Sequence, residues 1–409
     1  MRRRTVLGGA AAVVAGMVTG EATGMAVGET TQVAGDRGWW WGAASSSVQD
    51  EGASPRDDWS RWEEAGKAPA SGAGTGFRER YREDLRLIRS LGVTRYRTSV
   101  SWARVVPEPG RVDRAEVEHV RRVLTAGREA GLQMWLTLLH SAIPRWFAEE
   151  GGFAGPTAAA RWREWVELVA ADFGGEVDGW MPINNPGSYA MKAYLNGTFP
   201  PGVRDLEVFA RALEVMHRCD AQAAVMLREA TGLPVTSNQS LAPLWPADDS
   251  AAAVAATARF DALLWSWLPA AAAFDQIGFS YYYGAAIAGD GSLRPWPADR
   301  APGPLGYVPW ADGLGIVLDR LHTALPGREL VMAEVGYGGN DDAARGEYLR
   351  AVDTQLRAAR ARGMNLTGAY LWTPIDNYEW LAGYDVPFGV LDAHRRERSS
   401  ARVLRELIG

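Results

Sequence analysis

Residues 77–100 read FRERYREDLRLIRSLGVTRYRTSV, and this stretch contains the unit from which the fold is built. On one face of residues 78–91, Tyr81, Leu85 and Ile88 recur at helical spacing, and charged residues fill the opposite face. Gly92 follows, as is common where a helix ends in a short loop. The short run Thr94–Val100 then predicts a strand. A helix that leads directly into a strand is the repeating element of sheets with parallel strands.

The same alternation of short strand-like runs and longer helical patterns continues along the chain. Eight runs predict strands, at Trp39–Ala43, Thr94–Val100, Gln133–Leu139, Gly179–Ile183, Pro234–Asn238, Asp275–Ser280, Glu329–Ala333 and Thr367–Trp372. Eight strand–helix units in one chain indicate a single closed (β/α)8 barrel, the TIM barrel of the α/β class, which commonly reaches about 250 residues or more.

The alternative of an open, doubly wound sheet is less consistent with the sequence. Such sheets carry a Gly-rich phosphate-binding loop after an early strand, and no such motif is present. The Gly- and Pro-rich stretch Gly289–Pro309 predicts a long loop after the sixth strand instead.

Composition argues against several classes of function. The 409 residues carry a net charge of -6 with dispersed basic residues, so we expect no nucleic-acid binding. No His, Cys and Asp residues stand at metal-ligand spacing, so neither a metal nor another cofactor is expected. Cys219 is the only cysteine and falls in an apolar helical pattern, which predicts a buried residue and no disulfide framework.

Residues 1–35 predict an export signal and spacer, and residues 36–409 predict the barrel domain. Arg2, Arg3 and Arg4 precede a short apolar run, as in a secretory signal, and the pattern resembles a twin-arginine signal. The run is too short for a stable membrane span. We therefore expect a secreted or extracytoplasmic protein with no stable membrane insertion after signal removal. An uncleaved membrane anchor is the alternative.

The predicted strand ends carry a dense set of polar and aromatic side chains. In a barrel, the loops after the strands converge on one mouth, where chemistry gathers. Sugars require such a mixture, because hydroxyls need paired donors and acceptors while ring faces pack on apolar surfaces. We therefore expect a small-molecule glycoside or an oligosaccharide as the ligand. The strand-end residues are Gln49, Arg97, His140, Asn184, Asn185, Asn238, Tyr282, Glu334 and the run Trp372–Trp380.

Several motifs resemble those of glycoside hydrolase family 1, the β-glucosidase family. They include WGAASSSVQDEG at 41–52, YRTSVSW at 96–102, LTLLH at 136–140 and LWTPIDNYEW at 371–380. The likeness extends from Trp39 to the C-terminus. It implies a (β/α)8 barrel and a retaining mechanism, in which a carboxylate attacks the anomeric carbon and forms a covalent glycosyl intermediate.

Position by position, the resemblance implies a sugar subsite. Glu334, within VMAEVG at 331–336, falls on the family's nucleophile, and Arg97 and Tyr282 fall on the residues that hold and orient it. A guanidinium beside Glu334 should favour its ionised form. The residues expected to contact the sugar are Gln49, His140, Asn184, Trp372, Glu379 and Trp380.

The fourth-strand motif departs from the family at its acid/base position. The family's Asn-Glu-Pro reads Asn184-Asn185-Pro186 here, so an amide stands where the general acid/base carboxylate belongs. An amide can neither protonate a departing oxygen nor deprotonate an incoming water. General acid–base help typically contributes ~10²–10⁴-fold in rate, so hydrolysis of an unactivated β-glycoside should be poor.

Nearby acids do not clearly replace the missing group. Asp50 follows Gln49, and alternation along a strand would direct it away from the sugar. Glu149 and Glu150 follow the third strand and are expected to be solvated loop charges. Further departures from the family pattern concern substrate identity more than fold, and occur at Ser141, Ser280, Val335 and Ala382.

Three functions fit the sequence. The first is a retaining β-glycosidase or transglycosidase that forms a glycosyl-Glu334 intermediate, with weak or unusual acid/base catalysis. The second is a glycoside-modifying enzyme of specialised metabolism whose substrate or acceptor supplies the missing group. The third is a catalytically silent sugar-binding barrel. Retention of Glu334, Arg97 and Tyr282 favours chemistry, because a pure binder gains nothing from an attacking carboxylate.

Overall fold

The computed structural model describes residues 38–409, and Trp39–Gly409 form one compact unit. Its main sheet has eight parallel strands: β1 (Trp40–Ala44), β2 (Arg95–Ser99), β3 (Gln133–Leu139), β4 (Gly179–Ile183), β5 (Gln239–Ser240), β7 (Ile277–Ser280), β10 (Leu330–Val335) and β11 (Leu366–Trp372). The predicted export signal and spacer lie outside the described residues and stay predictions.

The main sheet closes on itself. Its strand order is β4-β3-β2-β1-β11-β10-β7-β5, so the first strand lies beside the last in the chain. At the other side, Val235 pairs with Trp180 of β4, and Thr236 pairs with Gln276 just before β7. The segment ahead of β5 therefore has a neighbour on each side and joins the two ends of the sheet. The prediction of a single (β/α)8 barrel is confirmed.

The strand predictions agree with the structure to within a few residues, except at the fifth strand. That strand was expected at Pro234–Asn238, whereas its regular pairing extends only over β5 and its earlier residues form isolated bridges. One cause is that the Val235 amide donates to the Asp275 carboxylate at 2.8 Å. A side chain thus replaces part of the backbone ladder.

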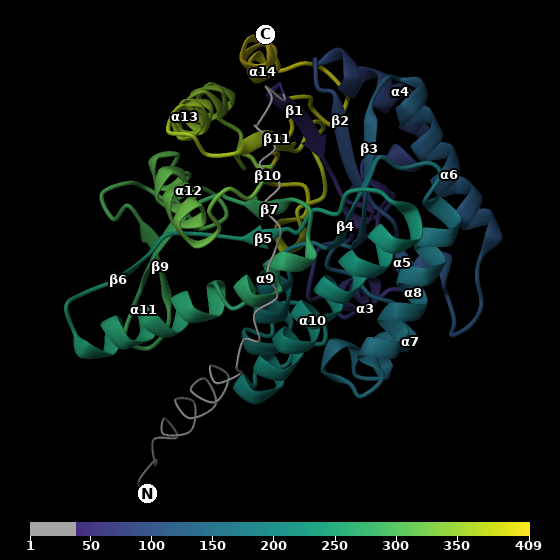
Figure 1. Ribbon diagram of the computed structural model, residues 1–409, viewed down its shortest axis with the longest axis horizontal. Helices are drawn as coiled ribbons and strands as arrows, with labels where there is room; N and C mark the ends of the chain where they lie inside the picture. The colour runs from purple at the N-terminus through teal and green to yellow at the C-terminus, as the bar shows by residue number, and fades with distance from the viewer. Residues whose placement is uncertain (1–37) are drawn as a thin grey trace, which may run out of the picture. The chain divides into compact units, whose positions relative to one another are not determined.

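Helices connect the strands and surround the sheet (Figure 1). Tyr81, Leu85 and Ile88 of α4 are buried, as their spacing predicted. Cys219 is buried on α10, and burial raises the pKa of its thiol to about 12. The longer helices are α4 (Phe77–Ser90), α6 (Arg114–Glu129), α8 (Ala158–Phe173), α10 (Leu206–Thr231), α11 (Ala251–Leu264), α12 (Asp312–Ala324), α13 (Asp342–Ala361) and α14 (Ser399–Ile408). The shorter ones are α2 (Ser47–Glu51), α3 (Asp58–Glu64), α5 (Trp102–Val105), α7 (Arg145–Glu149) and α9 (Pro186–Ala190).

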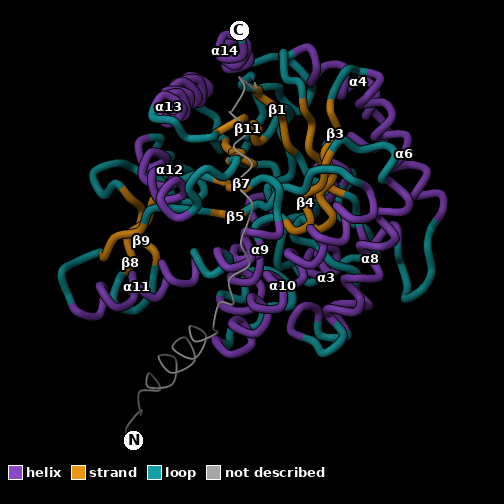
Figure 2. Tube along the Cα trace, in the orientation of Figure 1, coloured by secondary structure: helices purple, strands orange, loops and turns teal. Residues whose placement is uncertain are grey.

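The expectation of one long loop after the sixth strand was wrong in part. A second sheet contains β6 (Leu244–Pro246), β8 (Gly284–Ile287) and β9 (Leu293–Trp296), and β9 falls inside the expected loop. β8 and β9 pair antiparallel, and Figure 2 shows them with α11 apart from the main strands. Trp245 stacks on Trp296 at 4.9 Å and packs against Trp310 at 5.5 Å. This contact between distant segments supports the sheet despite its Gly- and Pro-rich sequence.

Candidate active site

Glu334 lies at the C-terminal end of β10, where the strand contains a β-bulge. The register of β10 shifts between Met332 and Glu334 against β7, and between Met332 and Val335 against β11. Bulges commonly re-aim side chains next to active sites. The Glu334 side chain is only 5% exposed. A side chain at position 336 would collide with the Trp372 carbonyl of β11, so Gly336 lets the two strand ends approach closely.

The two shortest hydrogen bonds to the Glu334 carboxylate fall one on each oxygen. Arg97 of β2 is fully buried and donates from Nη2 to Oε1 at 2.7 Å and to the Ala333 carbonyl at 3.1 Å. Tyr282, which follows β7, donates its hydroxyl to Oε2 at 2.9 Å. Burial, and then the charge of Glu334, raise the pKa of Tyr282 well above its ordinary value. The phenol therefore stays protonated and remains a donor to the carboxylate.

Two asparagines connect this ion pair to the neighbouring strand ends. Arg97 Nη1 donates to Asn184 Oδ1 at 3.3 Å, and Asn238 Nδ2 donates to the same oxygen at 2.6 Å. Asn238 Nδ2 also lies 3.4 Å from Glu334 Oε1, and its own Oδ1 accepts from Ser280 at 2.9 Å. Sequence reasoning placed Asn238 at a strand end without giving it a role. Its contacts make it a shared support for Asn184 and Glu334.

Asn185 lies directly beside Glu334, at the N-terminus of α9. Its Nδ2 is 3.5 Å from Glu334 Oε2. Its backbone has φ 47° and ψ 56°, in the left-handed region, where Asn is enriched among non-glycine residues. Its Oδ1 is buried and makes no hydrogen bond within the described part of the chain. The neutral amide can donate to the carboxylate, whereas a second carboxylate at this separation would repel it.

Gln49 and Glu379 form another polar part of the mouth. Gln49 Nε2 donates to Glu379 Oε2 at 3.1 Å and to the Tyr378 carbonyl at 2.8 Å. Burial raises the pKa of Glu379 to about 7, while the nearby Lys192 opposes this shift. Sequence analysis placed Gln49 at a strand end. In the structure it lies on the short helix α2 that follows β1, because the chain turns before reaching it.

Stacked rings line the mouth between these polar groups. The His140 ring lies parallel to Trp372 at 5.3 Å and to Trp380 at 6.4 Å. His140 Nε2 is 3.3 Å from Asn184 Nδ2, and its Nδ1 has no partner among residues 38–409. Burial, then the charges of Arg97 and Lys192, keep the pKa of His140 well below its usual range. The neutral imidazole of His140 and the indoles of Trp372 and Trp380 thus provide flat apolar surfaces, and the unpaired His140 Nδ1 lies among them.

The other candidate acids face elsewhere. Asp50 is buried on α2, and its carboxylate accepts from the Tyr96 hydroxyl at 3.4 Å. Sequence reasoning assigned its direction to strand alternation, which was wrong because the local structure is helical. Glu149 and Glu150 form ion pairs with arginines at 3.1 Å and 2.9 Å. They end helix α7 and each has an arginine partner, so they are not the loop charges that were expected. None of the three takes the acid/base place.

Lys192 belongs to this mouth, although sequence analysis did not single it out. It lies in a π-helical segment, Met191–Leu195, that continues from α9. Its side chain is exposed to solvent, yet surrounding protein desolvates it enough to lower its pKa, while Glu379 and Glu334 oppose that shift. The available signal was its position in the sequence: it follows Asn185 by seven residues, on the helical segment whose N-cap is Asn185.

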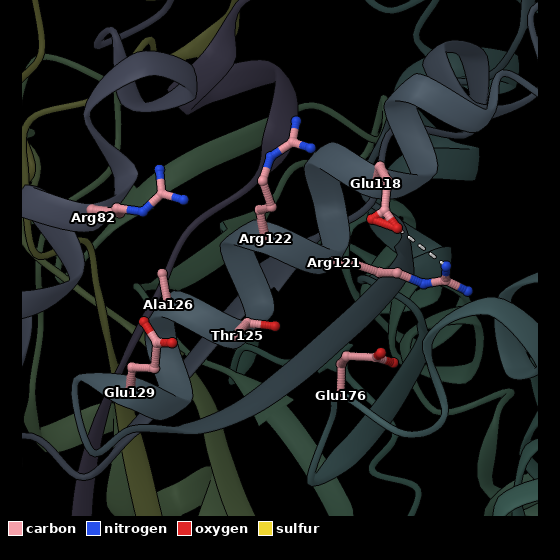
Figure 3. A pocket seen from close by; sticks show the side chains of 8 residues that line it. All are labelled: Arg82, Glu118, Arg121, Arg122, Thr125, Ala126, Glu129 and Glu176. Atoms are coloured by element: carbon pink, nitrogen blue, oxygen red, sulfur yellow. Dashed lines mark hydrogen bonds and ion pairs between the residues drawn. The ribbon is translucent and has the colours of Figure 1, made fainter.

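Two charged clusters lie elsewhere on the barrel. Figure 3 shows a surface hollow on α6, in which Glu118 pairs with Arg121 at 3.4 Å; its lining residues are Arg82, Glu118, Arg121, Arg122, Thr125, Ala126, Glu129 and Glu176. A second cluster places possible ligand atoms of Glu51, Glu116 and His119 within 4.8 Å of one another. Arg78 already contacts Glu116 at 2.5 Å and Glu51 at 3.2 Å, which supplies the compensating positive charge.

No helix within residues 38–409 is long and apolar enough to cross a membrane.

Comparisons with known proteins agree with this geometry. A model of the family described as Glycosyl hydrolase family 1 matches residues 36–283 and 306–408. The chain is 26% identical to beta-glucosidase A of Thermotoga maritima, over 87% of this chain and 92% of that protein. It is 28% identical to thermostable beta-glucosidase B of Thermobispora bispora, over 94% and 91% of the two chains. A chloroplastic galactolipid galactosyltransferase of Arabidopsis thaliana is 27% identical, over 79% of this chain and 55% of its own length.

A solved structure supports the same conclusion. The structure described as beta-glycosidase from Pyrococcus horikoshii matches with a TM-score of 0.83 and 26% identity, covering 90% of this chain and 93% of that one. The family match omits residues 284–305, which contain β8 and β9, and retains every strand that carries a candidate site residue. The chain therefore belongs to glycosyl hydrolase family 1, among O-glycosyl hydrolases and transglycosidases.

Proposed function

We propose that this protein is a retaining β-glycosidase or transglycosidase that acts on a β-glycoside through a covalent glycosyl intermediate on Glu334. The observation that carries this proposal is the bonding of the Glu334 carboxylate. Arg97 supplies a positive charge at 2.7 Å, and Tyr282 orients the other oxygen at 2.9 Å. Relatives named beta-glucosidase support hydrolysis, and the relative named galactolipid galactosyltransferase supports transfer.

In the first step, a sugar ring packs on the indoles while Gln49, His140, Asn184 and Glu379 bind its hydroxyls. A carboxylate oxygen of Glu334 attacks the anomeric carbon, and the bond to the aglycone oxygen breaks with its electron pair. Arg97 and Tyr282 keep the carboxylate aimed before the substrate arrives, and such preorganisation is a main source of rate enhancement.

In the second step, the oxygen of water or of an acceptor hydroxyl attacks the anomeric carbon and the bond from that carbon to Glu334 breaks. Glu334 recovers its charge, and the proton of the attacking hydroxyl leaves to a base. The Asn185 amide cannot move a proton in either step. Substrates whose leaving group departs without a proton should therefore react best, and acid/base catalysis should be weak or unusual.

Asn185 also favours a second candidate, a catalytically silent sugar-binding barrel. Its unpaired Oδ1 can accept a hydrogen bond from a bound glycoside without any reaction. A glycoside-modifying enzyme of specialised metabolism is a variant of the first function, in which the acceptor or substrate brings the missing group. The two classes differ in whether Glu334 ever forms a covalent bond.

Intact-protein mass spectrometry tests this difference. The mature protein is incubated with a 2-deoxy-2-fluoro-β-glucoside that carries a dinitrophenolate leaving group, which departs without an acid. We expect a mass increase of one fluorosugar, mapped to Glu334. Glu334→Gln should lose the adduct, and the surface variant Glu149→Gln should keep it. Saturable glycoside binding without an adduct would favour the silent barrel.

We also propose that residues 1–35 direct export through the twin-arginine route, as their sequence predicts. Replacing Arg3 and Arg4 by lysine should retain the protein inside the cell, because twin-arginine recognition depends on the arginine pair. Cell fractionation with antibody detection measures the outcome. Unchanged export in the double variant would reject this route.

A further inference from the structure

The chain uses lysine very sparingly. Lys67 and Lys192 are its only lysines among 43 lysine and arginine residues. Lys67 rests on the ring of Trp62 at 3.9 Å and is exposed. Lys192 lies at the barrel mouth. An arginine there would hold its proton at any physiological pH, whereas a lysine ammonium can release one.

Packing holds Lys192 beside the sugar-binding surfaces. The chain turns back after the π-helical segment, so the amides of Thr198 and Phe199 both donate to the Lys192 carbonyl, at 2.9 Å and 3.2 Å. The Lys192 ammonium lies 4.8 Å from the centre of the Phe199 ring. That ring packs on Trp380 at 5.4 Å, so the lysine is anchored to the wall of the candidate sugar subsite.

The charged groups around Lys192 are those of the candidate site. Its ammonium interacts electrostatically with Glu379 and Glu334, and it contributes to keeping His140 neutral. Lys192 lies on the π-helical segment that continues from α9, the helix whose N-cap is Asn185. In a retaining glycosidase the acid/base lies on the side from which the aglycone departs. Lys192 therefore follows on the segment that starts at the vacant acid/base position.

We propose that Lys192 replaces the missing carboxylate as the proton donor and acceptor of the reaction. In the first step, Glu334 bonds to the anomeric carbon, the glycosidic bond breaks, and a Lys192 proton goes to the departing oxygen. The resulting neutral amine then takes a proton from water or an acceptor hydroxyl, whose oxygen attacks the anomeric carbon and releases Glu334. Lys192 returns to its ammonium form, so protons and charges balance.

The proposal rests on the proposed function and makes a claim that can fail separately. Desolvation lowers the pKa of Lys192 and brings the ammonium closer to the range in which a general acid is effective. Because the protonated form donates in the first step, kcat/KM should fall as pH rises through that pKa. Glu379, with a pKa of about 7, contributes a separate transition.

Kinetics of Lys192→Met and Lys192→Arg test the role. On a methyl or methoxyphenyl β-glycoside, both variants should lose ~10²-fold or more in kcat/KM, the scale of general acid–base help. On the dinitrophenyl glycoside, adduct formation at Glu334 should change little. Equal activity of Lys192→Arg and wild type would show that only the charge matters, and would overturn the proposal. Absence of the adduct in wild type would instead overturn the proposed function and this inference with it.

The two lysines also permit a direct measurement in the intact protein. With 13Cε-labelled lysine, NMR should show two side-chain signals, assigned by their loss in Lys67→Met and Lys192→Met. The Lys192 signal should titrate below that of Lys67, and its midpoint should match the basic limb of kcat/KM. A mismatch larger than about one pH unit, or a basic limb that persists in Lys192→Met, would reject Lys192 as the donor.

Discussion

The two sides of the barrel mouth differ in how completely their polar groups are paired. On the side of Glu334, direct bonds of 2.7 Å and 2.9 Å hold both carboxylate oxygens. On the side of Asn185, the side-chain Nδ2 makes only a long 3.5 Å contact with Glu334, Oδ1 has no partner in the described residues, and Lys192 is open to solvent. A group that attacks one fixed atom benefits from being held before the substrate binds. A group that exchanges protons with changing partners, as proposed for Lys192, must keep hydrogen-bonding positions that no protein group occupies.

Asn185→Glu should have the largest effect on activity, because it places an ionisable group on the side of the mouth that lacks one at this position. In a Lys192→Met background, where no other group supplies the proton, a carboxylic acid at this position should raise kcat/KM on poor leaving groups by ~10²–10⁴-fold. In the wild type the gain should be smaller, because Lys192 already serves as proton donor. The backbone is left-handed there, so the variant should lose about 1–2 kcal/mol of unfolding free energy. Steady-state kinetics and urea unfolding measure the two effects.

Asn185→Gln is the matched control, because it has the same length without the acid. In a Lys192→Met background, Asn185→Glu should restore the activity that the lysine variant lost. If Asn185→Gln raises the rate equally, or if Asn185→Glu changes nothing while the Glu334 adduct still forms, the account of a missing acid fails.

Arg97→Met should destabilise the Glu334 side of the mouth, where the polar groups are paired. It leaves Glu334 as a buried charge without its cation, and breaking a buried pair typically costs about 3–5 kcal/mol. Urea unfolding and the rate of fluorosugar labelling measure the loss. Arg95→Met is the control on the same strand: Arg95 lies over the Trp40 ring at 4.0 Å, and its loss should cost about 1 kcal/mol. Similar losses in the two variants would mean that the Arg97–Glu334 ion pair contributes no more to stability than a cation–π contact on the same strand.

Tyr282→Phe should cause a smaller loss on the same side. It removes one hydrogen bond to a charged acceptor, worth about 1.5–3 kcal/mol, or ~10–100-fold in the labelling rate. Tyr283→Phe is the neighbouring control, since Tyr283 stacks on Tyr307 and should tolerate the loss of its hydroxyl. Labelling at the wild-type rate in Tyr282→Phe would indicate that Arg97 alone orients Glu334.

Asp50→Asn should leave chemistry largely intact and change only the pH dependence of stability. Burial raises the pKa of Asp50 to about 7, so the folded state holds a proton that the unfolded chain releases above about pH 4. This stabilisation is complete below pH 4 and is lost as pH rises toward 7. The neutral variant should avoid that loss, at most about 4 kcal/mol, in urea unfolding from pH 4 to 8. Glu118→Gln, at an exposed carboxylate, is the control and should behave as wild type.

Local pattern was sufficient for the barrel, and the resemblance to family 1 named the residues on the Glu334 side of the mouth. β3 and β4 have the predicted bounds, and the face of α4 is buried as predicted. Glu334, Arg97 and Tyr282 meet because the ends of parallel strands converge on one mouth. These three residues come together because of the barrel topology, and the alternation of strands and helices in the sequence already predicts that topology.

Other features depend on contacts that no local pattern contains. The β8–β9 pair is supported by Trp245 and Trp310, which lie in separate segments of the chain. Gln49 lies on a helix, although it closely follows a strand. Lys192 lies against Phe199, which follows it in the chain and packs in turn on the distant Trp380.

By itself, the sequence determined the order of strands and helices, and its resemblance to family 1 led to the expectation that Asn185 stands at an acid/base position. Hydrophobic periodicity relates residues that are close in the sequence, so it can be recognised without knowing the fold. The residue type at each position can likewise be read directly from the sequence. Only the tertiary structure decided which of the polar groups at the mouth are paired, which remain open and which titrate at unusual pH. Burial and the distances between charges arise from segments far apart in the chain, and these quantities exist only once the barrel has closed.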